Sequence, residues 1–317
     1  MKYIFFGTPK FGELILNRLL QAGLVPALVV TAPDKPVGRS QALTPPPVKV
    51  LAQAHGISVL QPDRIRRSLE DITSLAPDFI VVAAYGIILP SWLIKLPSYG
   101  CLNVHPSLLP YHRGASPIQS AILLGDQKTG VTIMLMDELV DHGPIIKQEV
   151  LKDTDMRSIA FPELHDKLAD LGGHLLAETI PLWFAGEIEA VPQDETQATM
   201  TNQIAKEDGR IDWSLPAKDI AQRVRAFTPW PGTFTVFQDK EGKQKTMKIL
   251  VASVLEQNSH GPFGDPGKTF LAPNDKIAVQ TGEGFLVLEE IQVEGKKPVK
   301  TKEFLLGNYE FVGTTFE

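Results

Sequence analysis

The sequence predicts an α/β protein in which a mostly parallel sheet is followed by a small β-barrel. As far as residue 184, short apolar runs alternate with stretches of helical periodicity, which is typical of βαβ units around a parallel sheet. A polar stretch comes next, and short alternating runs punctuated by Gly and Pro fill the last third. A chain of 317 residues is long enough for two cores. We predict a first domain at 1–188, a linker at 189–204 and a second domain at 205–317.

The chain begins as a Rossmann-like unit does, with a strand, a glycine turn and a helix. Lys2 to Phe6 forms the apolar strand, Gly7 breaks it, and apolar residues then recur on one helical face as far as residue 20. Gly7 and Gly12 do not complete the G-x-G-x-x-G fingerprint, so a nicotinamide enzyme has little support. Further strands are expected at 25–31, 57–60, 79–83 and 100–104, and 129–136 and 144–150 are expected to pair.

Helical periodicity recurs at 115–124 and over 158–184, where the apolar residues indicate a long amphipathic helix packed on the sheet. In the last third, Ser214 precedes a helical pattern that ends near Ala226. Alternating runs at 248–254, 276–280 and 284–293 predict the strands of the barrel. Trp213 and Trp230 are expected in its core.

Composition excludes several classes of protein. Hydrophobic residues make up 43% and charged residues 21%, which is ordinary for a globular protein, and the net charge of −6 argues against wholesale polyanion binding. The single cysteine, Cys101, excludes an internal disulfide and a cysteine metal cluster, and its apolar neighbours predict burial. Apolar runs stay short of membrane-spanning length and no signal segment precedes the first strand, so we expect a cytoplasmic protein without a membrane partner.

Three polar residues form the candidate site. Asn103 and His105 are two apart, so on a strand both side chains leave the same face, and Pro106 ends the strand there. Asp141 lies in a glycine-bounded turn after an apolar run, and a turn that folds back brings its carboxylate to the imidazole. An amide and an imidazole can stabilise an oxyanion, and a carboxylate can tune the imidazole, which favours acyl transfer to a substrate amine. The alternative is an ordinary strand end followed by a loop.

The run Asn-x-His-Pro-Ser-Leu-Leu-Pro at 103–110, with Asp-x-Gly at 141–143, resembles the folate-dependent formyltransferase family. The resemblance implies that Asn103, His105 and Asp141 are catalytic and that 10-formyltetrahydrofolate is the co-substrate, with no metal. It also implies a folate site formed by Ser107, Leu108, Leu109 and Pro110 together with Ala84, Tyr85, Gly86 and Ile87. The chain departs from the family pattern at Leu139, where Gly is usual, and at His142, where Thr is common. Asp137 is the second candidate for the carboxylate.

Two further stretches resemble the members of this family that act on methionyl-tRNA. The stretch 33–47 is too rich in Pro and Gly to be a regular element, and it resembles the loop that enters the tRNA acceptor stem, with Gln41 and Ala42 where lysines are usual. The last third resembles their OB-like domain, which contacts tRNA. The resemblance implies initiator methionyl-tRNA as partner, held by Phe11, Gly38, Arg39, Lys296 and Lys297.

Charge leaves alternatives open. Residues 206–317 carry 15 Lys and Arg against 16 Asp and Glu, whereas a nucleic-acid module usually has a basic excess. A formyltransferase acting on an amino-sugar nucleotide or another small amine would need the same catalytic residues. A nonenzymatic RNA-binding protein is the third possibility, and the Asn103, His105 and Asp141 set argues against it. A monomer is expected for a two-domain enzyme with a large substrate.

Overall fold

The computed structural model describes residues 1–38, 41–239, 241–255 and 264–317. The chain folds into two compact units, each described separately below. The units interleave along the sequence, because two short segments from the first half of the chain group with the last third. Unit 1 comprises Met1–Pro117, Lys128–Thr154 and Glu163–Asn202, and unit 2 comprises Ile118–Gln127, Asp155–Pro162 and Gln203–Glu317.

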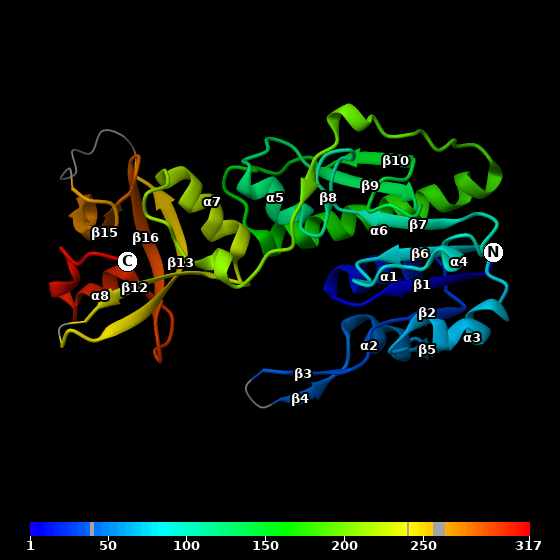
Figure 1. Cartoon of the computed structure of the whole chain (residues 1–317), viewed down its shortest axis with the longest axis horizontal. Coiled ribbons are helices and arrows are strands. Elements are labelled where there is room, and N and C mark those ends of the chain that lie inside the picture. The colour runs from blue at the N-terminus through cyan, green and yellow to red at the C-terminus, as the bar shows by residue number, and fades with distance from the viewer. Residues whose placement is uncertain (39–40, 240, 256–263) are drawn as a thin grey trace. The chain divides into compact units, whose positions relative to one another are not determined.

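A seven-stranded sheet forms the centre of unit 1, in the order β10-β9-β7-β6-β1-β2-β5 (Figure 1). Its five strands from β7 to β5 run parallel, and β9 and β10 are antiparallel, so the predicted mostly parallel sheet is confirmed. The strands are β1 (Tyr3–Gly7), β2 (Leu28–Val30), β5 (Val59–Leu60), β6 (Phe79–Ala83), β7 (Cys101–His105), β9 (Gly130–Leu135) and β10 (Ile145–Val150).

The inner strands are apolar on both faces because other elements cover both sides of the sheet. All five residues of β1 and of β6 are buried. The predicted strand at 25–31 is too long, however: β2 is limited to three residues, and Val25 is 59% exposed in the turn before it. Apolar sequence alone did not locate the point at which this strand starts to pair.

Helix α1 (Lys10–Gln21) turns Phe11, Ile15 and Leu19 inward, as its periodicity predicts. Gly12 on the same face approaches the end of β6, where a Cβ atom would lie 2.7 Å from the carbonyl oxygen of Ala83. This glycine therefore allows close helix–strand packing. Among the described residues as far as 200, the other α-helices are α2 (Pro47–Ala54), α3 (Leu69–Thr73), α4 (Ser91–Ile94), α5 (Pro117–Leu123) and α6 (Phe161–Ala185).

The stretch 33–47 contains regular structure, contrary to our expectation. Strands β3 (Lys35–Val37) and β4 (Ala42–Thr44) pair antiparallel as a hairpin, and α2 begins at Pro47. All six hairpin residues are exposed, and the hairpin extends away from the sheet in Figure 1. Proline fits this edge pairing because an outward-facing N–H is not needed there.

The polar stretch after α6 runs back over unit 1. Val191 pairs with Ile145 at the start of β10, and a 3-10 helix follows at Glu195–Gln197. The short strand β11 (Met200–Thr201) then pairs in parallel with β8 (Arg113–Gly114) (Figure 1). We call residues 191–201 the return segment. Its polar composition predicted a linker, but its hydrogen bonds are made with unit 1, and the predicted bounds of the linker and the two domains stay a prediction.

Unit 2 is built on an antiparallel sheet in the order β12-β13-β16-β15-β14, with β17 paired to β16. Register shifts between Ile249 and Ala252 mark bulges, which bend a strand and curl a sheet. The predicted OB-like character is therefore confirmed. The elements are α7 (Ala217–Phe227), β12 (Thr233–Gln238), β13 (Gln244–Val254), β14 (Thr269–Ala272), β15 (Lys276–Gln280), β16 (Phe285–Val293), β17 (Val299–Lys300) and α8 (Thr301–Leu305).

The two predicted core tryptophans of unit 2 differ. Trp213 is 5% exposed, stacks on Phe316 and donates its indole N–H to Thr235 at 2.9 Å. Trp230 is 55% exposed, so its assignment to the core was wrong. Among the helices that the structure describes, none combines the length and apolar character that a bilayer crossing requires.

Candidate active site

Asn103 and His105 lie on β7, between the parallel strand β6 and the antiparallel strand β9. Asn103 is opposite Val82 of β6 and Met134 of β9, and His105, the last residue of β7, is opposite Thr132 of β9. The two-residue spacing places both side chains on one face, as predicted. His105 is 4% exposed, so its imidazole works in a largely water-excluded position.

Asp141 brings its carboxylate to both residues. Its Oδ1 accepts a hydrogen bond of 3.3 Å from Asn103, and its Oδ2 lies 3.6 Å from Nδ1 of His105. The backbone N–H of Gly114 donates to the same Oδ2 at 2.9 Å. The predicted meeting of a carboxamide, an imidazole and a carboxylate is therefore present in the structure.

The second ring nitrogen of His105 fixes the proton arrangement. Nε2 lies 2.9 Å from the carbonyl oxygen of His112, and since a carbonyl only accepts, Nε2 carries a hydrogen and donates it. Nδ1 faces the Asp141 carboxylate at 3.6 Å, an ion-pair distance that is longer than a hydrogen bond.

The turn that carries Asp141 forms without glycine at position 139. Leu139 is 62% exposed, and Asp141 itself adopts a φ of 48°. Gly143 is needed for close approach, because a Cβ atom there would lie 1.9 Å from the carbonyl oxygen of Leu135. The turn thus places its glycine two residues after the aspartate.

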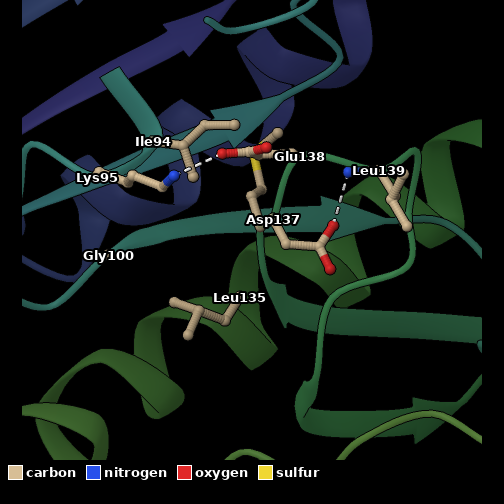
Figure 2. Close-up of a pocket in the computed structure, with 8 residues that line it drawn as sticks. Ile94, Lys95, Gly100, Leu135, Asp137, Glu138 and Leu139 are labelled. Carbon is tan, nitrogen blue, oxygen red and sulfur yellow. Dashed lines mark hydrogen bonds and ion pairs between the residues drawn. The ribbon is translucent and has the colours of Figure 1, made fainter. Parts of the chain in front are cut away.

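Asp137, the second candidate carboxylate, has other partners. It accepts from the backbone N–H of Leu139 at 2.9 Å, as Figure 2 shows, and it lies 2.5 Å from Nδ1 of His142. Nε2 of His142 lies 3.5 Å from Glu195. These contacts favour Asp141 over Asp137 as the partner of His105.

The return segment reaches this turn through Gln193. Its Nε2 donates to the carbonyl oxygens of Asp141 and Gly143, each at 2.8 Å. Arg113 donates to Gln193 and to Glu195, and its hydrogen bonds with Glu195 lower the pKa of that carboxyl and raise the pKa of Arg113. Sequence reasoning missed Gln193, because a polar stretch after a helix carries no signal of what it contacts, and it missed Arg113, whose partners Gln193 and Glu195 are about 80 residues away in the sequence.

The residues predicted for folate lie at the same end of the sheet as His105. Ala84–Ile87 follow β6 in a turn with φ of 50° at Ala84 and 80° at Gly86, and Ala84, Gly86 and Ile87 are exposed. Tyr85 is the exception: it is 3% exposed and its ring packs edge-on against Phe6. Ser107–Pro110 follow β7 directly, with Ser107 and Leu109 buried and Leu108 and Pro110 partly exposed.

A cavity of about 460 Å³ lies beside the segment that leads to Asp141 (Figure 2). Its walls are Ile94, Lys95, Gly100 and Leu135–Leu139, and Lys95 holds Glu138 at 2.6 Å. Within the described residues, none of the eight predicted for folate lines it. The cavity could have been predicted from two features of the sequence: the apolar residues of its wall, and the position of Leu135–Leu139 just before Asp141.

The residues predicted for tRNA or methionine are dispersed. Phe11 is 4% exposed and packs edge-on against His165 within unit 1. Gly38 lies at the exposed end of β3 with a φ of 71°, and Arg39 lies outside the described residues. Lys296 and Lys297 belong to unit 2, where they line a cavity of about 820 Å³. Among the described residues, His, Cys, Asp and Glu do not gather in any group of three or more that could hold a metal ion.

Comparison with known sequences gives two matches that together span most of the chain. The formyl transferase family matches residues 1–180, and the formyl transferase C-terminal domain matches residues 203–309. The chain is 40% identical over 312 residues to the methionyl-tRNA formyltransferase of Geobacter sulfurreducens, covering 97% of this chain and 94% of that protein. It is 44% identical over 309 residues to that of Geobacillus thermodenitrificans, covering 96% and 93%.

Solved structures share the fold at low sequence identity. An N-formyltransferase from Helicobacter canadensis, solved with folinic acid and dTDP-3-aminofucose, has a TM-score of 0.63 at 17% identity over 91% of this chain and 98% of that chain. HypX from Aquifex aeolicus, solved with tetrahydrofolic acid, has a TM-score of 0.61 at 17% identity and covers 98% of this chain and 47% of that chain. These two likenesses concern the fold alone.

Proposed function

The chain belongs to the methionyl-tRNA formyltransferase family, and we propose that Asn103, His105 and Asp141 are the residues with which it formylates the amino group of methionine on initiator tRNA. The observation that carries the proposal is the convergence of the three side chains at the carboxyl end of β7. In open α/β sheets, the carboxyl ends of the strands are also where a ligand is expected. The amino-sugar alternative rests on likeness of fold alone.

In the proposed reaction the methionyl amine attacks the formyl carbon, and the carbonyl oxygen becomes an oxyanion. The Asn103 amide has two hydrogens, one used toward Asp141, so the other is available to the oxyanion. As the new C–N bond forms, the amine loses a proton to the His105–Asp141 pair. The bond between the formyl carbon and N10 of the carrier then breaks, and N10 receives a proton.

The donor is proposed to be 10-formyltetrahydrofolate. A reduced pterin needs an apolar wall and a few backbone partners, which is the usual composition of a small-molecule site. Ile87 is 46% exposed, Leu139 is 62% exposed and Val140 is 55% exposed, and all three belong to segments next to catalytic residues. The turn at Ala84–Ile87 and the segment Ser107–Pro110 are proposed to supply the remaining contacts.

For the RNA, we propose the exposed hairpin of unit 1 and the Lys296–Lys297 pair of unit 2 as contacts. The hairpin presents Val37 and Leu43, which are 55% and 69% exposed, and apolar side chains can pack on unstacked bases. We also propose that the protein acts as a monomer, which size-exclusion chromatography with and without tRNA would test.

The experiment is a transfer assay with the purified protein, 10-formyltetrahydrofolate and methionyl initiator tRNA. Formation of formylmethionyl-tRNA, identified by mass spectrometry of the released amino acid, is expected. An amino-sugar nucleotide serves as the competing acceptor at matched concentration, and uncharged initiator tRNA, which has no methionyl amine, is the control that binds without reacting. Formylation of the sugar without formylation of the tRNA would overturn the proposal.

A further inference from the structure

We propose that Gln193 is a positioning residue for Asp141, holding the catalytic turn in place from the return segment. This inference rests on the proposed function, because it assigns Gln193 a role in the chemistry of Asp141. Gln193 is 52 residues from Asp141 in the sequence, yet its Nε2 lies 2.8 Å from the carbonyl oxygen of Asp141 and 2.8 Å from that of Gly143. These two hydrogen bonds hold the backbone on both sides of His142.

Both the nitrogen and the oxygen of the Gln193 side-chain amide form hydrogen bonds. The two hydrogens on Nε2 match the two carbonyl oxygens of the turn, and Oε1 accepts from Nε of Arg113 at 3.0 Å and from Nη2 of Arg113 at 2.8 Å. A side chain that uses both ends of its amide in four hydrogen bonds has a fixed orientation. Gln193 therefore transmits the position of Arg113 to the turn.

Arg113 is itself held firmly. Its side chain is 5% exposed and donates to both carboxylate oxygens of Glu195, at 2.9 and 2.6 Å, in the bidentate arrangement that gives Arg–carboxylate pairs their directionality. Its backbone N–H donates to Thr199 at 2.9 Å. The next residue, Gly114, donates to the Asp141 carboxylate. The pair Arg113–Gly114 thus fixes Asp141 twice, directly at the carboxylate and through Gln193 at the carbonyl.

The turn requires such support because Asp141 adopts a φ of 48°, in the left-handed region that non-glycine residues seldom occupy. A conformation of this kind persists when the surroundings over-determine it. Leu139 is exposed and is not among the described residues with a positive φ, so the strain lies at Asp141 itself. The carbonyl groups of Asp141 and Gly143 receive it from Gln193. Without those bonds, the carboxylate is expected to lose its fixed distance to Nδ1 of His105.

Two substitutions at Gln193 separate its roles. Gln193→Leu keeps most of the volume and removes both the donors and the acceptor. Gln193→Glu keeps an oxygen that accepts from Arg113, so the contact that ties this residue to Arg113 is retained. It replaces the Nε2 donor by an oxygen, which faces the two carbonyl oxygens of the turn. Gln197→Leu is the matched control: it lies in the same segment, and its bonds are to Asp194 and Tyr111.

The measurements are kcat and KM for formyl transfer to methionyl initiator tRNA, the dissociation constant of that tRNA, and Tm. Both Gln193 variants are expected to lose roughly tenfold or more in kcat, since misplacing a catalytic group by about 1 Å can cost as much as a hundredfold. KM and the tRNA dissociation constant are expected to stay within about twofold, because an interaction that serves only the transition state affects kcat and leaves binding unchanged. Gln197→Leu is expected to match the wild-type protein.

The outcomes separate this inference from the proposed function. A wild-type protein that transfers no formyl group overturns the proposed function. A wild-type protein that is active, with both Gln193 variants folded and equal to Gln197→Leu in kcat, overturns the positioning role alone. A loss of activity that equals the unfolded fraction found in the melting curves, or that appears equally in tRNA binding, overturns it too, since it would mean that Gln193 supports only the fold.

Discussion

The hydroxyl of Thr132 donates a hydrogen bond of 2.7 Å to the carbonyl oxygen of Ser107, tying the middle of β9 to the segment that leaves β7. The same oxygen of Thr132 accepts from the backbone N–H of Leu109 at 3.1 Å and from Gln148 at 2.8 Å. Thr132 is fully buried. One hydroxyl therefore holds the backbone of the segment proposed to contact folate.

Thr132→Val is expected to lower the free energy of unfolding by about 1–3 kcal/mol, because it keeps the shape and leaves buried partners without a hydrogen bond. It is also expected to weaken binding of the folate donor, since the Ser107–Pro110 segment loses its anchor. Urea unfolding and a tetrahydrofolate titration measure the two effects. Thr154→Val, in a loop where the hydroxyl donates to the carbonyl oxygen of Lys152 at 3.2 Å, is the control. Equal stability of the two variants would contradict the prediction.

The proposed catalytic role of the Asp141 carboxylate is tested by comparing two aspartates of one turn. Asp141→Asn is expected to reduce kcat about a hundredfold or more, because the amide can no longer share a proton with His105 or offset its charge. Asn103→Ala and His105→Ala are expected to cause losses of the same order. Asp137→Asn is expected to reduce kcat far less, since the hydrogen-bond partners of Asp137 are Leu139 and His142. Steady-state kinetics that reversed the ranking of the two aspartates would reassign the site.

The thiol of Cys101 is expected to be unreactive in the native protein. It is fully buried on β7 and lies 3.7 Å from the carbonyl oxygens of Leu93 and Ile94, and burial raises the pKa of the thiol to about 12. Since the thiolate is the reactive form, a disulfide reagent at pH 8 should modify the native protein at a small fraction of the rate found in urea. With one cysteine in the chain, the absorbance change reports this residue. Rapid modification of the native protein would contradict its placement.

The strands that surround the site could be predicted because burial on both faces leaves a clear signal in sequence. Continuous apolar runs located β1 and β6 to within about a residue, and the two-residue spacing placed Asn103 and His105 on one face. Asp141 was found from its neighbourhood of glycine and an apolar run. Local pattern was sufficient for these features because each depends on residues close together in sequence.

The remaining features depend on contacts between distant residues. Gln193 lies in a polar stretch that could equally be solvated, and its bonds to Asp141 and Gly143 exist only because the chain returns past β10. The hairpin at Lys35–Thr44 was hidden by Pro36, by the prolines that flank it and by its exposure, since an edge pairing of three residues buries too little to leave an apolar pattern. Trp230 was misplaced because a large aromatic side chain predicts burial whatever its surroundings.

An ion pair between Asp34 and Lys49 holds the start of the β3–β4 hairpin, and its contribution to stability depends on pH. Asp34, directly before β3, accepts hydrogen bonds from Gln61 at 2.8 Å and from Lys49 of α2 at 2.8 Å. Both hydrogen bonds lower the pKa of Asp34, and the one from Gln61 has the larger effect. Because the pKa is lower in the folded protein than in the unfolded chain, the carboxylate stabilises the fold above the unfolded value of about 3.9, and the contribution fades as pH falls through the folded value.

Asp34→Asn is therefore expected to lower the urea midpoint at pH 7, with a difference from wild type that narrows as the pH falls below about 4. The matched control is Asp63→Asn, whose carboxylate is 75% exposed and lies 3.8 Å from Arg67, and it should leave the midpoint unchanged. Urea titrations of all three proteins between pH 3 and pH 7 measure this. A difference that widened toward acid would mean that protonation of Asp34 favours the folded state, and the pairing with Lys49 and Gln61 would then have to be abandoned.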